Sequence, residues 1–133
     1  YRIGTYIFND RSLVKKEICS DDKVALTVLA TVVSTPTKNR AIIDAGSKVL
    51  TSDLFGMNDH GYIVNFPELR ITQLTEEHGT IVSEQNTNLE IGQKIQIIPN
   101  HACVVTNMLN EVNLITEEKK IKKVKVIARG KVW

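Results

Sequence analysis

The sequence predicts an all-β domain, a barrel or a sandwich, with few short helices. Short runs rich in Val, Ile, Thr and Leu recur along the 133 residues, and turn-type clusters separate them. No segment carries the 3.6-residue apolar stripe of a long amphipathic helix. Several short strands at this spacing are typical of an all-β barrel or sandwich.

The first two strands are expected in the first third of the chain. "VALTVLATVV" (24–33) is dense in β-branched residues, and "RAIIDAG" (40–46) is a second apolar run. The "STPTKN" cluster between them contains Pro36 and Asn39 and predicts a turn. Residues 51–66 contain two glycines and have mixed polarity, so we expect an ordered excursion loop there.

The second half of the chain continues the pattern of short strands. "ELRITQL" (68–74) and "GTIVSE" (79–84) flank "TEEHG", which predicts a hairpin or tight corner around Gly79. Gly92 is expected to make the turn before "KIQIIP" (94–99). "EVNLIT" and "KIKKVKVIARG" close the chain as two further strands.

The lysine-rich end of the chain could suggest nucleic-acid binding. However, Ile121, Val124 and Val126 interleave with the lysines, as in a strand with one wet face, and Glu117 and Glu118 lie beside them. Lysines on such a face also discourage edge-to-edge pairing. We therefore favour a solvated strand and expect no nucleic-acid partner.

Composition indicates a soluble, cytoplasmic protein. Hydrophobic residues make up 42% and charged residues 24%, and the net charge of +2 is too small to indicate nucleic acid or a membrane surface. No apolar run approaches the roughly 20 residues that span a bilayer, and no signal segment is present. Cys19 and Cys103 are too few for a disulfide scaffold, and we favour two reduced thiols, although a single bridge between them stays open.

One histidine and one cysteine stand two positions apart in "IIPNHAC" (97–103). If this stretch is extended, His101 and Cys103 project to the same side, while Ala102 faces away. Imidazole and thiolate together suit zinc. The alternative is a packed cysteine beside a hydrogen-bonded histidine, and the spacing alone leaves this choice open.

Other polar positions have structural and functional interpretations. The corner at Glu76, Glu77 and His78 could serve acid–base chemistry or complete a metal shell, or it could be a polar turn. Asp44 could be a ligand, but capping of a turn is favoured. His60 is expected in a loop. No P-loop, dinucleotide fingerprint or serine nucleophile elbow is present.

Six blocks of the sequence occur in a fixed order: "GTYIFND" (4–10), "ALTVLATVVS" (25–34), "AIIDAGSKVLTSD" (41–53), "LTEEHG" (74–79), "IIPNHAC" (97–103) and "VIARGK" (126–131). Together they resemble a known family, the C-terminal domain of D-serine dehydratases and D-threonine aldolases. The resemblance covers nearly the whole chain, and the ordered set is far more specific than any single block.

The resemblance implies a β-barrel-like C-terminal domain of a fold-type III pyridoxal-phosphate enzyme, similar to alanine racemase. Residues 1–133 would form this single domain. The N-terminal α/β barrel, with the Schiff-base lysine and phosphate site, would lie outside this chain, and "YRIGTY", without an initiator methionine, fits that expectation. Lys48 in "DAGSK" is expected to be structural or solvated, so no residue of this chain would bind pyridoxal phosphate. The parent enzyme would be a homodimer.

The resemblance also implies site residues. In the dehydratases the His and Cys of this motif bind zinc, and they fall here on His101 and Cys103. The aldolases usually have a histidine and an aspartate at these positions, so Cys103 favours the dehydratases. Glu77, His78 and Tyr6 belong to other shared blocks and are expected in the wall of the active site.

The function that follows is a metal-bearing domain of an enzyme acting on a β-hydroxy D-amino acid. D-serine dehydratase, with zinc-assisted loss of the β-hydroxyl, is the leading hypothesis. D-threonine aldolase, which cleaves the Cα–Cβ bond, is an alternative, and a non-catalytic β-domain for dimerisation or protein contact is another. Because the cofactor lysine would lie elsewhere, we expect the isolated chain to be inactive.

Overall fold

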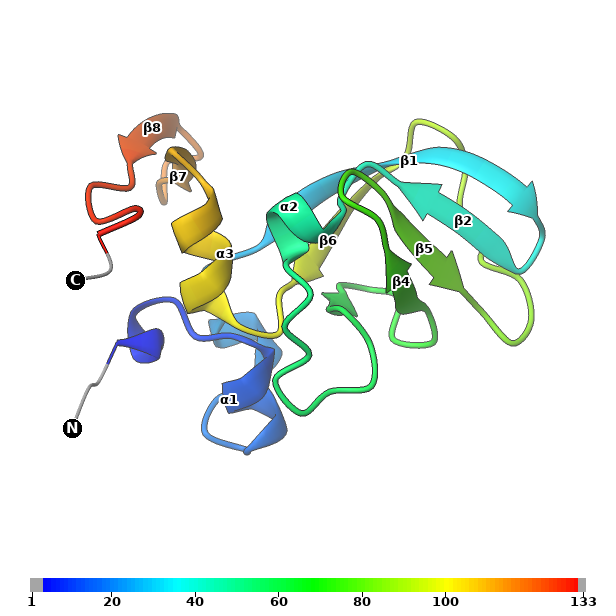
Figure 1. Ribbon diagram of the computed structural model, residues 1–133, viewed down its shortest axis with the longest axis horizontal. Coiled ribbons are helices and arrows are strands. Elements are labelled where there is room, and N and C mark those ends of the chain that lie inside the picture. The colour runs from blue at the N-terminus through cyan, green and yellow to red at the C-terminus, as the bar shows by residue number, and fades with distance from the viewer. Residues whose placement is uncertain (1–3, 132–133) are drawn as a thin grey trace.

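The computed structural model describes residues 4–131 and is mainly β, with a nearly closed antiparallel barrel and few short helices, so the predicted fold class is confirmed (Figure 1). Neighbouring barrel strands follow the order β3-β6-β1-β2-β5-β4. These strands are β1 (Val28–Thr37), β2 (Arg40–Ile43), β3 (Tyr62–Ile63), β4 (Arg70–Leu74), β5 (Gly79–Val82) and β6 (Lys94–Ile98).

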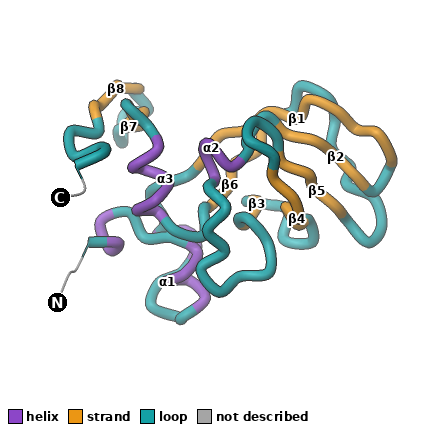
Figure 2. The backbone as a smooth tube through the Cα atoms, in the orientation of Figure 1, coloured by secondary structure: helices purple, strands orange, loops and turns teal. Residues whose placement is uncertain are grey.

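The helices are short and lie largely to one side of the barrel (Figure 2). They are α1 (Arg11–Lys15), α2 (Ser47–Leu50), α3 (Ala102–Met108) and the 3-10 turns η1 (Thr5–Ile7) and η2 (Asp21–Lys23). Even the longest, α3, has only 7 residues. Within residues 4–131, therefore, no helix could cross a bilayer.

Alternation along the strands builds the core. In β1, Val28, Ala30 and Val32 are buried while Leu29 is exposed, which matches the two-residue period of a strand. The inward residues of the other strands complete one cluster with Val105 of α3. They include Ile43, Ile63, Ile71, Ile81, Ile95 and Ile97. β-branched residues fill this pleated interior, so their abundance in the sequence follows from the architecture.

The barrel closes at the seam between β3 and β4. β3 pairs with β6 through only two residues, and the amide of His60 donates to the carbonyl of Ile71 at 3.0 Å across the seam. The predicted excursion of residues 51–66 is confirmed as mostly loop, with the short β3 near its end. His60 lies in this loop, as expected.

The predicted hairpin around "TEEHG" is confirmed as the antiparallel pair β4–β5. The helix α2 rests on its turn, because the amides of Ser47 and Lys48 donate to the carbonyls of Thr75 (2.8 Å) and Glu76 (3.1 Å). The turn at Gly92 is also confirmed, with a φ of +89° that suits glycine.

The predicted turn at residues 34–39 is wrong in part. β1 continues through Pro36 to Thr37, and only Lys38 and Asn39 form the turn. Proline is tolerated because it lies where the β1–β2 register shifts, and beyond the β1 residues that pair with β6. Its missing amide therefore breaks no regular ladder hydrogen bond.

The last two strands, β7 (Glu111–Ile115) and β8 (Ile121–Lys125), form a hairpin separate from the barrel, next to α3 (Figure 1). The strands were predicted, but the expectation of one wet face is wrong. All five residues of β8 are exposed, and among residues 4–131 β7 and β8 pair only with each other.

Replacement of Gly46 by alanine should destabilise the fold. A Cβ there would lie 2.5 Å from the carbonyl oxygen of Thr75 and against the carbonyl of Glu76, both of which are backbone atoms. Overpacking of this kind costs about 1–3 kcal/mol of unfolding free energy or more. Urea denaturation should show this loss for Gly46→Ala but not for Gly4→Ala, where the new methyl meets no atom within 4 Å. Equal stability of both variants would contradict this packing.

His60 should make stability pH-dependent. Burial lowers its pKa below the ordinary value of 6.5, although the charge of Asp59 opposes this effect. Its Nδ1 is buried without a hydrogen-bond partner among the described residues. The neutral ring is therefore favoured in the folded state, and this contribution is complete above the ordinary pKa and is lost as pH falls through the lower folded pKa. Urea titrations should show a smaller stability loss on acidification for His60→Gln than for the wild-type chain, and an equal loss in both would contradict this role of His60.

Candidate metal centre

His101 and Cys103 lie at a strand-to-helix junction. β6 ends at Ile98, His101 is the residue before α3, and Cys103 is in the first turn of that helix. The expectation of an extended chain from Ile97 to Cys103 is therefore wrong, and the alternation argument does not apply to this pair. Pro99 ends the strand as expected, and the helix begins three residues later.

The helix begins at Ala102 because a buried carboxylate receives its first amide. Asp10 is 0% exposed, and its Oδ2 accepts a hydrogen bond from the amide of Ala102 at 2.9 Å. Its Oδ1 accepts from the amides of Ser12 (3.0 Å) and Leu13 (3.3 Å) and from the Ser12 hydroxyl. One carboxylate thus caps α1 and the start of α3, which satisfies amides that lack helical partners.

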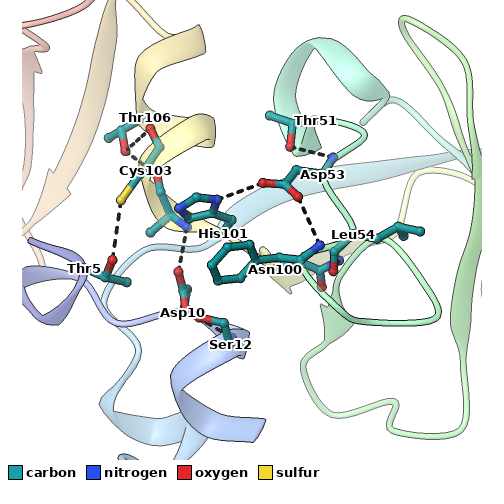
Figure 3. A network of polar contacts seen from close by, with 12 residues as sticks. Thr5, Asp10, Ser12, Thr51, Asp53, Leu54, Asn100, His101, Cys103 and Thr106 are labelled. Carbon is teal, nitrogen blue, oxygen red and sulfur yellow. Dashed lines mark hydrogen bonds and ion pairs between the residues drawn. The ribbon is translucent and has the colours of Figure 1, made fainter. Parts of the chain in front are cut away.

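His101 is held by the loop that follows α2 (Figure 3). Its Nδ1 lies 2.8 Å from Oδ2 of Asp53. The Phe55 ring stacks on the imidazole, with 4.3 Å between ring centroids and 20° between their planes. The His101 side chain is 20% exposed, so it is only partly buried.

Cys103 is an exposed free thiol beside the N-terminal segment of the chain. Its Sγ lies 3.5 Å from the hydroxyl of Thr5 in η1. Tyr6 follows Thr5 in the sequence, and its side chain is 60% exposed. Cys19 also forms no disulfide in the structure.

The residue before His101 is also fixed by hydrogen bonds. Asn100 is 2% exposed, and its Nδ2 donates to the carbonyls of Leu54 (3.3 Å) and Asp59 (2.7 Å). Its Oδ1 accepts from Arg11 at 3.2 Å, and Arg11 also forms an ion pair with Asp59. The loop of residues 51–59 is therefore joined to the junction at two consecutive residues, Asn100 and His101.

The corner at Glu77 and His78 lies on the turn between β4 and β5. Glu77 forms an ion pair with Lys48, and His78 hydrogen-bonds through its backbone to Thr75. No hydrogen bond or ion pair joins Glu77, His78 or Tyr6 to the His101–Cys103 pair in the part of the chain that is described. Their place in the active-site wall stays a prediction.

Lys48 does not suit a Schiff base. The hydrogen bond and charge of Glu77 raise the pKa of this lysine, so its amine is held in the protonated form. Schiff-base formation requires the neutral amine. Its side chain is also 62% exposed, in agreement with the expected solvated role.

Asp44 has a structural role. Its Oδ1 accepts a hydrogen bond from the amide of Thr31 at 2.6 Å, which joins the end of β2 to β1. Ligation by Asp44 therefore has no support in this geometry, whereas capping of the backbone does.

An open hollow of about 510 Å³ lies away from the pair, between α1 and the β3–β4 side of the barrel. Arg11, Asp59 and Tyr62 are among its lining residues, whereas His101 and Cys103 are not. Its most buried cation, Arg11, is already paired with Asp59. We therefore place the candidate chemistry at the donor atoms of His101 and Cys103, rather than at this hollow.

The chemistry of the two donor side chains suits zinc. Asp53 occupies Nδ1 of His101, so Nε2 is the nitrogen left for a metal, and Cys103 offers an exposed sulfur. Within residues 4–131, no group of three or more His, Cys, Asp or Glu side chains is arranged to hold an ion. An ion held by this pair would therefore take its remaining ligands from outside these side chains.

Residues that position the pair were missed by the sequence reasoning. Asp10 and Asp53 end two of the shared blocks, "GTYIFND" and "AIIDAGSKVLTSD", but the sequence analysis singled out Tyr6, Asp44 and Lys48 from these blocks instead. The polar ends of these blocks were the available signal. Asn100 and Phe55 gave no comparable signal, since their roles depend on contacts formed in the folded chain.

Comparison of sequences identifies the family. The family model described as "Putative serine dehydratase domain" matches residues 25–115. An uncharacterized protein of Mycobacterium tuberculosis is 36% identical over 119 residues, covering 85% of this chain and 90% of its own length. D-serine dehydratase of Dictyostelium discoideum is 33% identical over 132 residues, covering 89% of this chain but only 33% of the enzyme.

Solved structures share the fold. D-threonine aldolase of Filomicrobium marinum has a TM-score of 0.78 and 27% identity, and the match covers 98% of this chain and 36% of the aldolase. A cysteine-to-alanine variant of D-threo-3-hydroxyaspartate dehydratase in its metal-free form has a TM-score of 0.76 and 25% identity, with coverages of 92% and 37%. The chain spans about a third of these enzymes. It belongs to the serine dehydratase domain family.

Proposed function

We propose that this chain is the metal-bearing domain of a pyridoxal-phosphate enzyme acting on β-hydroxy D-amino acids, most closely of the D-serine dehydratase type. The observation that carries the proposal is the junction at residues 100–103. There the histidine has one nitrogen bonded to Asp53 and the other free, and Cys103 presents an exposed thiol. The similarity to D-serine dehydratase over 89% of the chain supports the same substrate class.

The donor chemistry favours zinc. An imidazole and a thiolate are typical zinc ligands, whereas a carboxylate in place of the thiolate would accept harder ions. One of the similar solved structures, with 25% identity, is a cysteine-to-alanine variant of D-threo-3-hydroxyaspartate dehydratase in its metal-free form. This pairing supports a role for a cysteine in metal binding in this family. The other coordination positions would be left for water and substrate.

The chain's own residues would hold and orient the site. His101 and Cys103 would bind the ion, and Asp10 and Asn100 would fix the backbone that carries them. The bound zinc would supply Lewis acidity to the substrate β-hydroxyl, a poor leaving group. Lys48, the lysine in a shared block, is protonated and paired with Glu77, which does not suit it to a Schiff base with pyridoxal phosphate. That cofactor would be held by the N-terminal barrel, the partner of this domain, and the whole enzyme would be a homodimer.

Two alternatives remain as proposals. A D-threonine aldolase activity is supported by the similarity to the solved aldolase, and it would use the same two donors before Cα–Cβ cleavage. A non-catalytic β-domain that contacts another protein is the second alternative. It is supported by the mycobacterial relative, because this chain matches 90% of that relative's length and the relative is therefore little longer than this domain.

Zinc binding tests the donor pair. The purified chain should bind one zinc ion with modest affinity, since it supplies only two protein ligands. His101→Ala and Cys103→Ser should each weaken binding at least about 100-fold, because loss of a ligand costs more than the roughly 10- to 100-fold loss seen for outer-shell partners. Competition titration measures these affinities, and cobalt substitution should give a thiolate absorption band that depends on Cys103.

The matched control is Cys19→Ser, which removes the other free thiol. This variant should bind zinc as the wild type does and keep the cobalt band. Absence of zinc binding by the wild-type chain, or loss of binding only in Cys19→Ser, would remove the metal function and return His101 and Cys103 to packing roles.

Activity assays separate the reaction types. The isolated chain with added pyridoxal phosphate should release no ammonia from D-serine, because it lacks a suitable lysine. An enzyme that contains this domain and its barrel should release ammonia and a 2-oxo acid from D-serine, and a chelator should abolish the release. Glycine and an aldehyde from D-threonine would instead support the aldolase. Turnover by the isolated chain would contradict the expectation that the cofactor lysine lies in the N-terminal barrel.

A further inference from the structure

The loop of residues 51–59 orients the imidazole through one carboxylate. Asp53 Oδ2 lies 2.8 Å from Nδ1 of His101, and Asp53 Oδ1 accepts the amide of Phe55 at 3.0 Å. Both carboxylate oxygens are therefore occupied, so the side chain is held in place. A carboxylate can only accept hydrogen bonds, so Nδ1 must carry a proton. In the neutral ring the lone pair is then on Nε2.

Phe55 fixes the plane of the same ring. Its side chain stacks on His101, although it is itself 47% exposed. Rotation of the imidazole would break the stacking and the hydrogen bond to Asp53 together. The histidine is therefore restrained at one face and at one edge by two residues of a single loop.

The loop that makes these two contacts with His101 has an uncommon backbone conformation at two residues. Thr51 and Phe55 have φ values of +62° and +47°, in the left-handed region that favours glycine. For a β-branched residue such as Thr51 this is a genuine outlier. Strain of this kind persists only where surrounding contacts compensate for it, and it concentrates at functional sites. The compensating contacts include the hydrogen bond from Asn100 to the Leu54 carbonyl.

We infer that Asp53 is a positioning residue that holds His101 in the tautomer with the proton on Nδ1, so that Nε2 is presented to the metal, while Phe55 fixes the ring plane. The role of the metal rests on the proposed function, whereas the tautomer does not. Carboxylates that bond to the second nitrogen of a metal-binding histidine set its tautomer and increase its basicity.

The tautomer is measured first, in the metal-free chain. Long-range ¹H–¹⁵N spectra of the histidine rings, recorded at about pH 8 because an ordinary histidine has a pKa of about 6.5, should show His101 with its proton on Nδ1. Asp53→Asn should give a mixture of tautomers, because an amide can either accept or donate a hydrogen bond. Asp21→Asn is the matched control, since that aspartate is exposed and distant in the sequence, and it should leave the His101 signals unchanged.

Zinc affinity is the second readout on the same variants. Asp53→Asn should weaken binding by about 10- to 100-fold, as expected for the loss of an outer-shell partner. Asp21→Asn should bind as the wild type does. Unchanged signals from the core in the backbone amide spectra of Asp53→Asn would show that the variant is folded and that its loss of zinc affinity is a local effect. Should Asp53→Asn unfold, the wild-type tautomer still decides the inference.

The outcomes distinguish this inference from the proposed function. A proton on Nε2 of His101 in the wild-type chain, or zinc affinity unaltered in Asp53→Asn, would overturn the positioning role while zinc binding itself stands. A proton on Nδ1 without any zinc binding by the wild type would overturn the metal function, and with it the purpose assigned to Asp53. The expected tautomer together with weakened zinc binding in Asp53→Asn would support both.

Discussion

The buried carboxylate of Asp10 is the interaction on which the candidate site depends. It is fully removed from solvent, yet its two oxygens receive three backbone amides and one hydroxyl. Burial of a carboxylate is costly unless such bonds compensate for the lost hydration. By accepting from α1 and α3 together, Asp10 sets where the N-terminal segment meets the junction after β6, and so where the histidine and cysteine lie.

The three residues that begin this junction are each held from a different direction. Asn100 bonds to the carbonyls of Leu54 and Asp59, His101 to the side chain of Asp53, and Ala102 to Asp10. The backbone of a short strand-to-helix connection is thereby fixed without a disulfide. Such support by outer residues would keep a proposed metal site preorganised, because neither His101 nor Cys103 can reorient without breaking another contact.

Much of the fold could be predicted from local sequence, because its strands follow the two-residue alternation of buried and exposed side chains. The β4–β5 hairpin and the turn at Gly92 carry turn residues that are local signals. Pro36 misled the prediction because its tolerance depends on a register shift between two strands. The helical start of α3 was missed for a similar reason: its capping acceptor, Asp10, lies 92 residues from Ala102 in the sequence. Resemblance to a family supplied the donor pair, whereas the supporting residues required three-dimensional contacts.

The long sequence separations at the junction have a consequence for the order of folding. Thr5 meets Cys103 across 98 residues, Asp10 meets Ala102 across 92, and Asp53 meets His101 across 48. Closing such long loops costs conformational entropy before any contact is gained, whereas a local hairpin such as β4–β5 costs little. The histidine and the cysteine are therefore held in place only once segments from distant parts of the chain have met. A chain that has not closed these contacts would leave both the thiol and the imidazole without support.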